Sequence, residues 1–150
     1  METMWKMLSE SPDALFFSRN DESDPRMGDI VLRGRENLSK KVRVGIVGVP
    51  EDEGVRRNRG RVGSKEAPYE IRKALYKFTP FAISKGKQVS ELTIFDFGNV
   101  KTGSSLEETH QLPLLEGTLD PFSRAVFLGL TADDDEGQIG RHRCRSCQRD

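Results

Sequence analysis

Residues 45–63 read Gly-Ile-Val-Gly-Val-Pro-Glu-Asp-Glu-Gly-Val-Arg-Arg-Asn-Arg-Gly-Arg-Val-Gly, and the predicted fold class follows from this segment and its neighbours. The run from Val42 to Val49 is rich in β-branched residues and is bounded by Pro50, which is typical of a buried strand. A loop rich in glycine and arginine follows, from Glu51 to Gly63. We expect this loop to leave the carboxyl end of the strand.

A helix with a clear start follows the loop. Pro68 suits the first helical turn, where no backbone N–H is needed, and Glu66 and Glu70 lie where the helix dipole favours anions. Apolar side chains at helical spacing predict the buried face of this helix: Ile71, Ala74, Leu75 and Phe78. The same pattern places Arg72, Lys73 and Lys77 largely off that face. Pro80 marks the end of the helix.

A second strand is predicted from Leu92 to Phe97, closed by Gly98 and Asn99. Strand, loop, helix and strand in this order form a βαβ unit, whose two strands are parallel and whose crossover is right-handed. Open parallel sheets bind ligands at the carboxyl ends of their strands, so the loop after Val49 lies where chemistry is expected. The predicted fold is α/β, as a partial doubly wound parallel sheet of only two strands.

The chain divides into three unequal parts. Residues 1–41 form an N-terminal arm with turn chemistry at 24–29, and its apolar side chains are able to dock on a core: Trp5, Leu8, Leu15, Phe16 and Phe17. Residues 42–110 hold the βαβ unit. Residues 111–150 form a divergent tail with one apolar run, from Ala125 to Leu130, followed by an acidic and then a basic block. We expect this tail to pack poorly.

Several motifs resemble the ureohydrolases, which make up the arginase family. These typically have an apolar strand, a phrase like D-E-G-V-x-x-N-x-G-R-x-G, a helix start G-P-x-x-I-R, and a second strand that ends D-x-G-D-V. The corresponding stretches of this chain are residues 45–63, Ala67-Pro68-Tyr69-Glu70-Ile71-Arg72 and Asp96-Phe97-Gly98-Asn99-Val100. Residues 15–21 and 24–29 resemble the leader of formimidoylglutamases in particular. The resemblance covers about residues 13–110, and Arg59 stands where relatives usually have a small residue.

This resemblance implies an activity. Ureohydrolases cleave C–N bonds of small amidines or guanidines with a binuclear manganese centre, and formimidoylglutamases release formamide and glutamate in histidine breakdown. Bound cations of this kind lower the pKa of water and orient its attack. Ligands rich in carboxylates, with some imidazole, suit manganese. A homo- or hetero-oligomer is compatible with the family.

The sequence departs from the family in its metal ligands. Those ligands come from three later motifs, Gly-Gly-Gly-His-Asp, Asp-Ala-His-x-Asp and Ser-x-Asp-x-Asp, and none of them occurs in this sequence. Only His110 and His142 are present, in other contexts. We therefore predict no catalytic and no metal-binding residue, no bound manganese and no activity of the chain alone. The match ends near Gln111, so a deletion, a frame change or an alternative transcript is one hypothesis. The alternative function is a non-enzymatic fragment that binds a full-length relative or has no function.

The loop supplies the candidate substrate-binding residues Arg56, Arg57, Asn58 and Arg61. The planar guanidinium of arginine binds a carboxylate in bidentate geometry, and a glutamate-type substrate carries carboxylates. The alternative is a solvated loop whose arginines pair with its own acidic residues, Glu51, Asp52 and Glu53. Neither a Walker lysine nor a GxGxxG pattern is present, which argues against a phosphate site.

Composition excludes several function classes. Lys plus Arg and Asp plus Glu each number 24 in 150 residues, so a net charge of zero gives no general attraction to nucleic acid or to an anionic membrane. No apolar run approaches the roughly 20 residues of a membrane span. The two cysteines, Cys144 and Cys147, indicate a reducing, cytoplasmic setting. With His142 they offer fewer ligands than a structural zinc site needs, so we expect free thiols.

Overall fold

The computed structural model describes residues 2–39, 42–82, 86–88, 92–103, 108 and 125–128. Within these ranges the elements follow in the order α1 (Glu2–Lys6), β1 (Leu8–Ser9), η1 (Asp13–Leu15), α2 (Met27–Ile30), η2 (Arg35–Ser39), β2 (Val44–Gly48), α3 (Glu53–Arg57), η3 (Ser64–Glu66), α4 (Ala67–Leu75), β3 (Phe81–Ala82), β4 (Lys87–Gln88), β5 (Ile94–Val100) and β6 (Ala125–Leu128).

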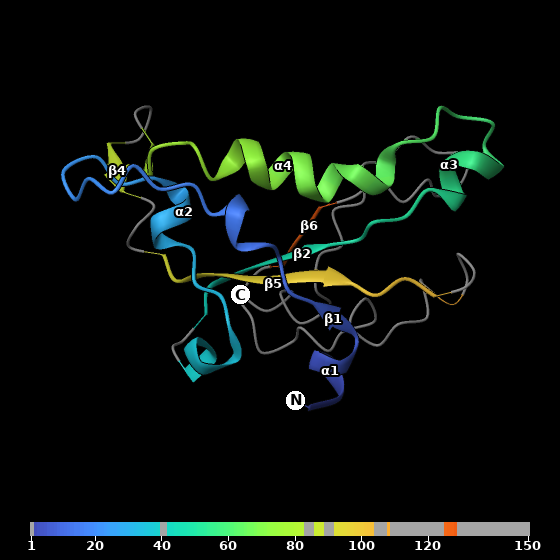
Figure 1. Ribbon diagram of the computed structural model, residues 1–150, viewed down its shortest axis with the longest axis horizontal. Coiled ribbons are helices and arrows are strands. Elements are labelled where there is room, and N and C mark those ends of the chain that lie inside the picture. The colour runs from blue at the N-terminus through green and yellow to red at the C-terminus, as the bar shows by residue number, and fades with distance from the viewer. Residues whose placement is uncertain are drawn as a thin grey trace, which may run out of the picture.

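A four-stranded sheet in the order β1-β5-β2-β6 forms the centre of the molecule (Figure 1). β2 pairs in parallel with both β5 and β6, which confirms the predicted parallel strands and the α/β class. β1 pairs antiparallel with β5, with Leu8 opposite Val100, so the sheet is mixed rather than wholly parallel. The sequence did not indicate β1 because two residues are too few to show an alternating pattern.

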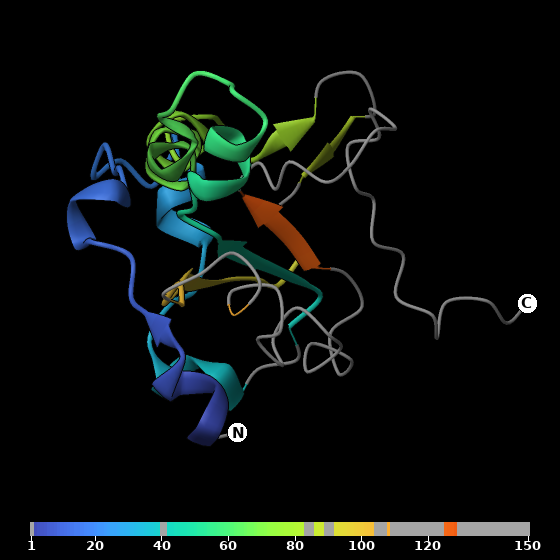
Figure 2. The same cartoon turned by 90° about the vertical axis from the view of Figure 1, so that its right-hand side faces the viewer.

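The late apolar run provides the fourth strand. β6 lies beside β2, with Gly45 opposite Ala125 and Gly48 opposite Leu128, as Figure 2 shows. The expectation of only two strands is therefore wrong, since β1 flanks β5 and β6 flanks β2. His110 and the cysteines at the end of the chain lie outside the described residues, as does most of the segment 111–150. That this segment packs poorly stays a prediction.

Apolar clusters cover both faces of the sheet, with α4 on one side and α1 on the other (Figure 1). The cluster on the α1 side consists of Met4, Leu8, Val42, Val47, Val49, Phe95, Phe97 and Val100. The cluster on the α4 side consists of Leu15, Met27, Val31, Ile46, Tyr76 and Ile94. The predicted docking of the arm is confirmed for Leu8 and Leu15, and Trp5 and Phe16 pack half-buried against these clusters. It is wrong for Phe17, which is 40% exposed.

A β-bulge interrupts β5. Ile46 lies opposite Asp96 and Gly48 opposite Asn99, so Phe97 and Gly98 together oppose the single residue Val47. Gly98 has a φ of +81°, and a Cβ at this position would collide with the carbonyl oxygen of Ser9. Because of the extra residue, Asp96 and Asn99 both face α4 although they are three positions apart.

The buried face of α4 differs from the predicted one. Ile71 is 41% and Phe78 64% exposed, Ala74 is exposed, and Leu75 is only half-buried. The helix instead buries Pro68, Arg72 and Tyr76, which recur every four residues. The prediction was wrong because it counted apolar side chains alone. Arg72 and Tyr76 point toward the sheet since Asp96 on β5 accepts hydrogen bonds from both of them.

Two segments predicted as turn or loop contain single helical turns. Residues 24–29 were expected to be a turn, yet α2 begins at Met27 because its first amides reach the end of α4: Met27 N–H donates to the carbonyl of Phe78 at 2.8 Å, and Gly28 N–H to that of Tyr76 at 3.1 Å. The predicted loop 51–63 likewise contains α3. Both helices are too short for hydrophobic periodicity to reveal them.

Candidate functional site

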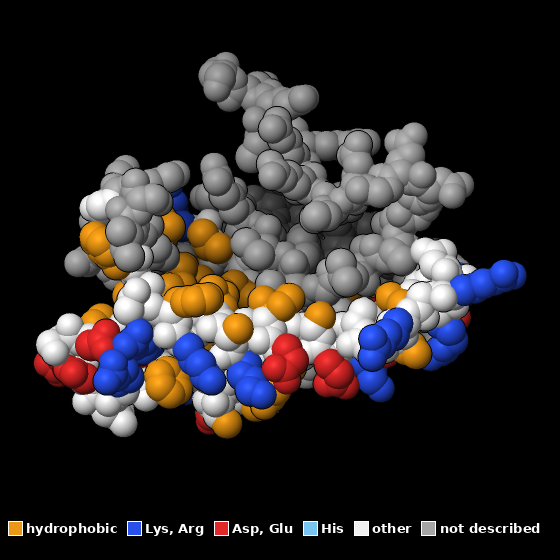
Figure 3. Space-filling model, turned by 90° about the horizontal axis from the view of Figure 1, so that it is seen from above, with side chains coloured by type: hydrophobic (Ala, Val, Ile, Leu, Met, Phe, Trp, Pro, Cys, Tyr) orange, Lys and Arg blue, Asp and Glu red, His pale blue; other side chains and the backbone are white. Residues whose placement is uncertain are grey.

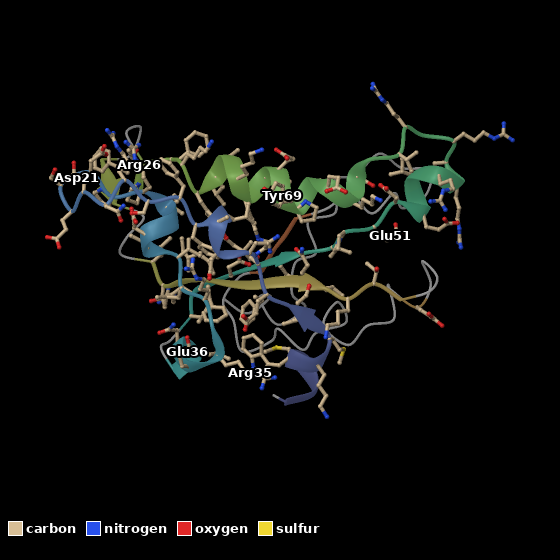
Figure 4. The ribbon with its side chains drawn as sticks, in the orientation of Figure 1. Asp21, Arg26, Arg35, Glu36, Glu51 and Tyr69 are labelled. Atoms are coloured by element: carbon tan, nitrogen blue, oxygen red, sulfur yellow. The ribbon has the colours of Figure 1, made fainter. Side chains whose placement is uncertain are left out.

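The loop after β2 begins at a buried carboxylate. Glu51 is 8% exposed and accepts hydrogen bonds from the backbone amides of Glu53 and Gly54, the latter at 3.1 Å. These amides belong to the first turn of α3, where backbone donors have no partner within the helix. Glu51 therefore starts α3 directly behind the carboxyl end of β2, and Figure 4 shows it between the strand and the helix.

Asp52 closes the loop. Its carboxylate accepts hydrogen bonds from the Gly63 amide at 3.1 Å, the Ser64 hydroxyl at 2.7 Å and the Lys65 amide at 2.9 Å. These donors, the Ser64 hydroxyl foremost, hold the pKa of the Asp52 carboxyl below its usual 3.8. The carboxylate is thus charged at neutral pH and joins the two ends of the loop.

The four predicted site residues lie together on the segment 53–62, which Asp52 closes by binding the Gly63 amide. Arg56 and Arg57 belong to α3, and both contact Glu53, with N–O distances of 2.5 and 3.2 Å. Asn58 ends the helix, and Arg61 follows as an exposed residue. The predicted pairing with the loop's acidic residues is thus observed for Arg56 and Arg57, with Glu53 as the acceptor.

The end of α3 has the geometry of a Schellman motif. The amide of Arg59 donates to the carbonyl of Arg56 at 3.0 Å, and that of Gly60 donates to the carbonyl of Val55 at 2.8 Å. Arg59 occupies the left-handed position of this motif with a φ of +54°. Glycine is the usual residue there, which explains why a small residue is expected at this position in relatives.

The exposed arginines form one basic surface at the end of the molecule. Lys and Arg side chains gather over α3 and the loop that follows it (Figure 3), and Arg56, Arg57, Arg59 and Arg61 are all exposed. A cavity of about 190 Å³ in the described part of the chain lies apart from this surface and is lined mainly by the N-terminal arm, including Trp5, Ser11 and Arg33.

A buried polar network lies behind the loop and was missed from the sequence. The Arg72 guanidinium donates from Nε and Nη2 to both oxygens of Asp96, each at 2.9 Å, and their side chains are 1% and 0% exposed. It also donates to Asn99 Oδ1 at 2.8 Å and to the carbonyl of Gly98 at 2.7 Å. The bulge makes this arrangement possible, because it aims the Gly98 carbonyl and the Asn99 side chain at the helix.

Tyr76 completes this network. Its hydroxyl donates to Asp96 Oδ2 at 2.6 Å. Burial first, and then the neighbouring Asp96 charge, raise the pKa of the Tyr76 phenol far above its usual 10.0. The phenol is therefore a permanent donor at neutral pH, and the network ties α4 to the carboxyl end of β5. A signal was present in the sequence, since Arg72, Asp96 and Asn99 all fall within the motifs that carry the family resemblance.

Comparison with known proteins agrees with these motifs. The family model of the arginase family matches residues 42–126. The chain belongs to the arginase family. The resemblance predicted from the strand, loop and helix motifs is thereby confirmed.

The curated relatives that match this chain are formimidoylglutamases. Formimidoylglutamase of Macrococcus caseolyticus is 37% identical over 125 residues, which cover 73% of this chain and 38% of that protein. Formimidoylglutamase of Staphylococcus haemolyticus is 35% identical over 81 residues, or 53% of this chain and 24% of that protein. The chain therefore spans well under half the length of the curated relatives it matches.

Solved structures of arginase-family proteins share the fold. A crystal structure of oxidized Trypanosoma cruzi formiminoglutamase with Mn²⁺ at pH 8.5 matches with a TM-score of 0.58 and 29% identity, covering 71% of this chain and 37% of that chain. The formimidoylglutamase structure from Bacillus subtilis matches with a TM-score of 0.59 and 17% identity over 83% of this chain and 38% of that chain, which is a likeness of fold alone.

The described part of this arginase-family chain does not fit a manganese centre. Within it, no three His, Cys, Asp or Glu side chains come close enough together to hold a metal ion. The carboxylates near the strand ends are already engaged: Glu51 and Asp52 by loop amides, and Asp96 by Arg72, Tyr76 and the Gly98 amide. None of the described helices has the length and hydrophobicity that a membrane crossing requires.

Proposed function

We propose that this chain carries the first part of an arginase-family hydrolase that cleaves the C–N bond of formimidoylglutamate, a linear amidine, to formamide and glutamate. Family membership and relatives named formimidoylglutamase support this lineage. One observation of the structure carries it: an exposed arginine loop is anchored at the carboxyl end of β2, beside the parallel strand β5. The carboxyl ends of parallel strands are where such folds bind their ligands.

In this proposal the loop binds the substrate and does no chemistry itself. The loop that carries Arg56, Arg57, Asn58 and Arg61 contacts a carboxylate of the glutamate part of the substrate through its exposed guanidinium groups, which bind carboxylates through paired N–H donors. The anchors at Glu51 and Asp52 reduce the number of conformations that binding must restrict. The substrate is therefore a small amidine that also carries a carboxylate.

The chain alone is proposed to be inactive. The manganese ions that supply the activated water in this chemistry need carboxylate and imidazole ligands, and the carboxylates at this sheet edge already accept other hydrogen bonds. Purified chain is incubated with formimidoylglutamate and an excess of MnCl₂, and formamide release is followed by NMR. We expect a rate equal to that of a sample with chelator, and any manganese-dependent turnover contradicts the proposal.

A second function is favoured by one specific observation. α4 exposes Ile71, and the turn just after the helix exposes Phe78, at 41% and 64%, beside the half-buried Leu75. An apolar helix face of this kind suits contact with another protein surface. The alternative is therefore a non-enzymatic fragment that binds a full-length relative. Size-exclusion chromatography of the chain mixed with a full-length formimidoylglutamase tests it: co-elution that Ile71→Lys abolishes supports this alternative, and separate elution contradicts it.

A further inference from the structure

The arginines of the loop differ in whether a carboxylate already occupies them. We propose that Arg59 and Arg61 are the side chains that take the ligand carboxylate, and that Glu53 is an internal carboxylate that masks Arg56 and Arg57. The inference rests on the proposed function, because it names which residues of that same site bind a carboxylate-bearing ligand. It adds Arg59, which the sequence prediction of the site did not include.

Glu53 already contacts two of the loop's arginines. One carboxylate oxygen lies 2.5 Å from Arg56 Nη1 and the other lies 3.2 Å from Arg57 Nε. Both pairs are formed within one helix, at spacings of three and four residues. A carboxylate held on the same helix turn acts at a high effective concentration, so a ligand carboxylate competes with it at a disadvantage.

Arg59 differs from these two arginines in its surroundings. It is exposed, no acceptor for its guanidinium lies within the described residues, and its backbone adopts the left-handed conformation at a φ of +54°. For an L-residue that conformation is less favourable than the right-handed one. Local strain of this kind is commonly retained where a side chain has a function. The charged side chain at a position that favours glycine therefore marks Arg59 as a binding residue.

Arg61 lies on the same short anchored segment. On one side the Gly60 amide is bonded to the Val55 carbonyl at 2.8 Å, and on the other the Gly63 amide is bonded to Asp52 Oδ1 at 3.1 Å. Both arginines thus project from a stretch of backbone that is held at each end and that follows α3, the helix on which Glu53 pairs with Arg56 and Arg57. Two exposed guanidinium groups on an anchored segment suit a carboxylate better than groups on a free chain.

An NMR titration of the intact chain tests the assignment. Isotope-labelled protein is titrated with sodium glutarate at constant ionic strength, with neutral glutaramide as the ligand control, and arginine Nε–H and loop amide shifts are followed. Arg59→Gly keeps the backbone conformation, Arg61→Gln removes the second charge, and Glu53→Gln removes the mask. Arg43→Gln serves as the matched control, since Arg43 is an exposed arginine outside the loop.

We expect saturable shifts with glutarate only, and a dissociation constant raised about two- to five-fold by Arg59→Gly and by Arg61→Gln, the scale of one exposed ion pair. Glu53→Gln should lower the dissociation constant by a similar factor because Arg56 loses its internal carboxylate partner, and Arg43→Gln should leave it unchanged. If glutarate binds but Arg56→Gln or Arg57→Gln weakens it more than Arg59→Gly does, the assignment is wrong while the site stands. Equal shifts with glutaramide, or none with glutarate, contradict the site itself and the assignment with it.

Discussion

Two arginine–carboxylate clusters of this chain use the same chemistry in different surroundings. The side chains of Arg72 and Asp96 are 1% and 0% exposed, whereas those of Arg56, Arg57 and Glu53 are 66%, 47% and 32% exposed. An exposed pair contributes about 0–1 kcal/mol because water screens it, but breaking a buried pair costs about 3–5 kcal/mol because a desolvated charge is left behind. The buried cluster therefore holds α4 on the sheet, while the exposed cluster is able to exchange its partners.

The largest expected effect breaks the buried cluster. Asp96→Asn leaves the Arg72 guanidinium buried without its counter-charge, and it weakens the bonds that Tyr76 and the Gly98 amide donate. We expect a loss of about 3–5 kcal/mol in the free energy of unfolding. Urea unfolding followed by circular dichroism measures it.

The exposed cluster supplies the matched control for that measurement. Glu53→Gln also removes one carboxylate charge from a pair of arginine contacts, but in a position open to water. We expect a change of less than about 1 kcal/mol. Equal losses for Asp96→Asn and Glu53→Gln would show that burial does not separate the two clusters.

A second prediction concerns the close approach of the helix to β2. A Cβ at Gly48 would collide with Asn99 Oδ1 and would lie 2.7 Å from Arg72 Nη1 and 2.8 Å from Pro68 Cβ. Gly48→Ala should therefore destabilise the fold by about 1–3 kcal/mol through overpacking of the buried cluster. The measurement is again the urea midpoint.

Gly86→Ala serves as the comparison for Gly48→Ala. A Cβ at Gly86 meets nothing within 4 Å, but its φ is +57°. We expect only the conformational cost there, about 1–2 kcal/mol less the roughly 0.5–1 kcal/mol by which alanine restricts the unfolded chain, or about 0.5 kcal/mol. A smaller loss for Gly48→Ala than for Gly86→Ala would mean that α4 shifts to make room.

The βαβ unit was predictable because hydrophobic runs and a proline mark its elements directly. The buried cluster was not, since it depends on a bulge that alternation patterns do not reveal. Counting by two from Asp96 places Asn99 on the opposite face, whereas the extra residue Gly98 turns it toward α4. Helical spacing failed at Arg72 for a related reason: hydrophobic periodicity assigns charged residues to solvent, and the buried acceptor that reverses this lies on another element.

The site was predictable in position but not in detail. Strand order placed the loop at the carboxyl end of β2, and the arginines suggested an anion. The Glu51 carboxylate accepts hydrogen bonds from the first amides of the short helix α3. This local contact forms the helix and so allows Glu53 to contact two arginines. Such contacts depend on loop geometry that composition does not encode. Whether Arg56, Arg57, Asn58 and Arg61 touch a substrate stays a prediction.

A third prediction separates the phenol of the buried cluster from its charges. Burial raises the pKa of Tyr76, so the neutral phenol is favoured in the folded state. Its contribution is complete below the unfolded-state pKa of 10.0 and is lost as the pH rises through the higher folded-state pKa. Wild-type protein should lose stability between neutral pH and about pH 11.

Tyr76→Phe isolates this contribution. At neutral pH it should cost about 1 kcal/mol, the value of one hydrogen bond, and it should flatten the alkaline loss. Tyr69→Phe is the matched control, because Tyr69 lies on the same helix and is 41% exposed. An alkaline profile that is identical in wild type and Tyr76→Phe would contradict the assignment of the loss to this phenol.

The smallest expected effect has the opposite sign and lies in the exposed cluster. Arg59→Gly removes the cost of a left-handed L-residue, about 1–2 kcal/mol. Glycine also raises the conformational entropy of the unfolded chain, which lowers the free energy of unfolding by about 0.5–1 kcal/mol. The net change should be a stabilisation of roughly 0.5 kcal/mol. Arg61→Gly is the matched control, since Arg59 and Asn20 are the non-glycine residues with positive φ in the described part of the chain. It should destabilise slightly, because it gains only flexibility in the unfolded state. If Arg59→Gly instead loses as much stability as Arg61→Gly, the guanidinium makes a stabilising contact, and Arg59 is not open to a ligand.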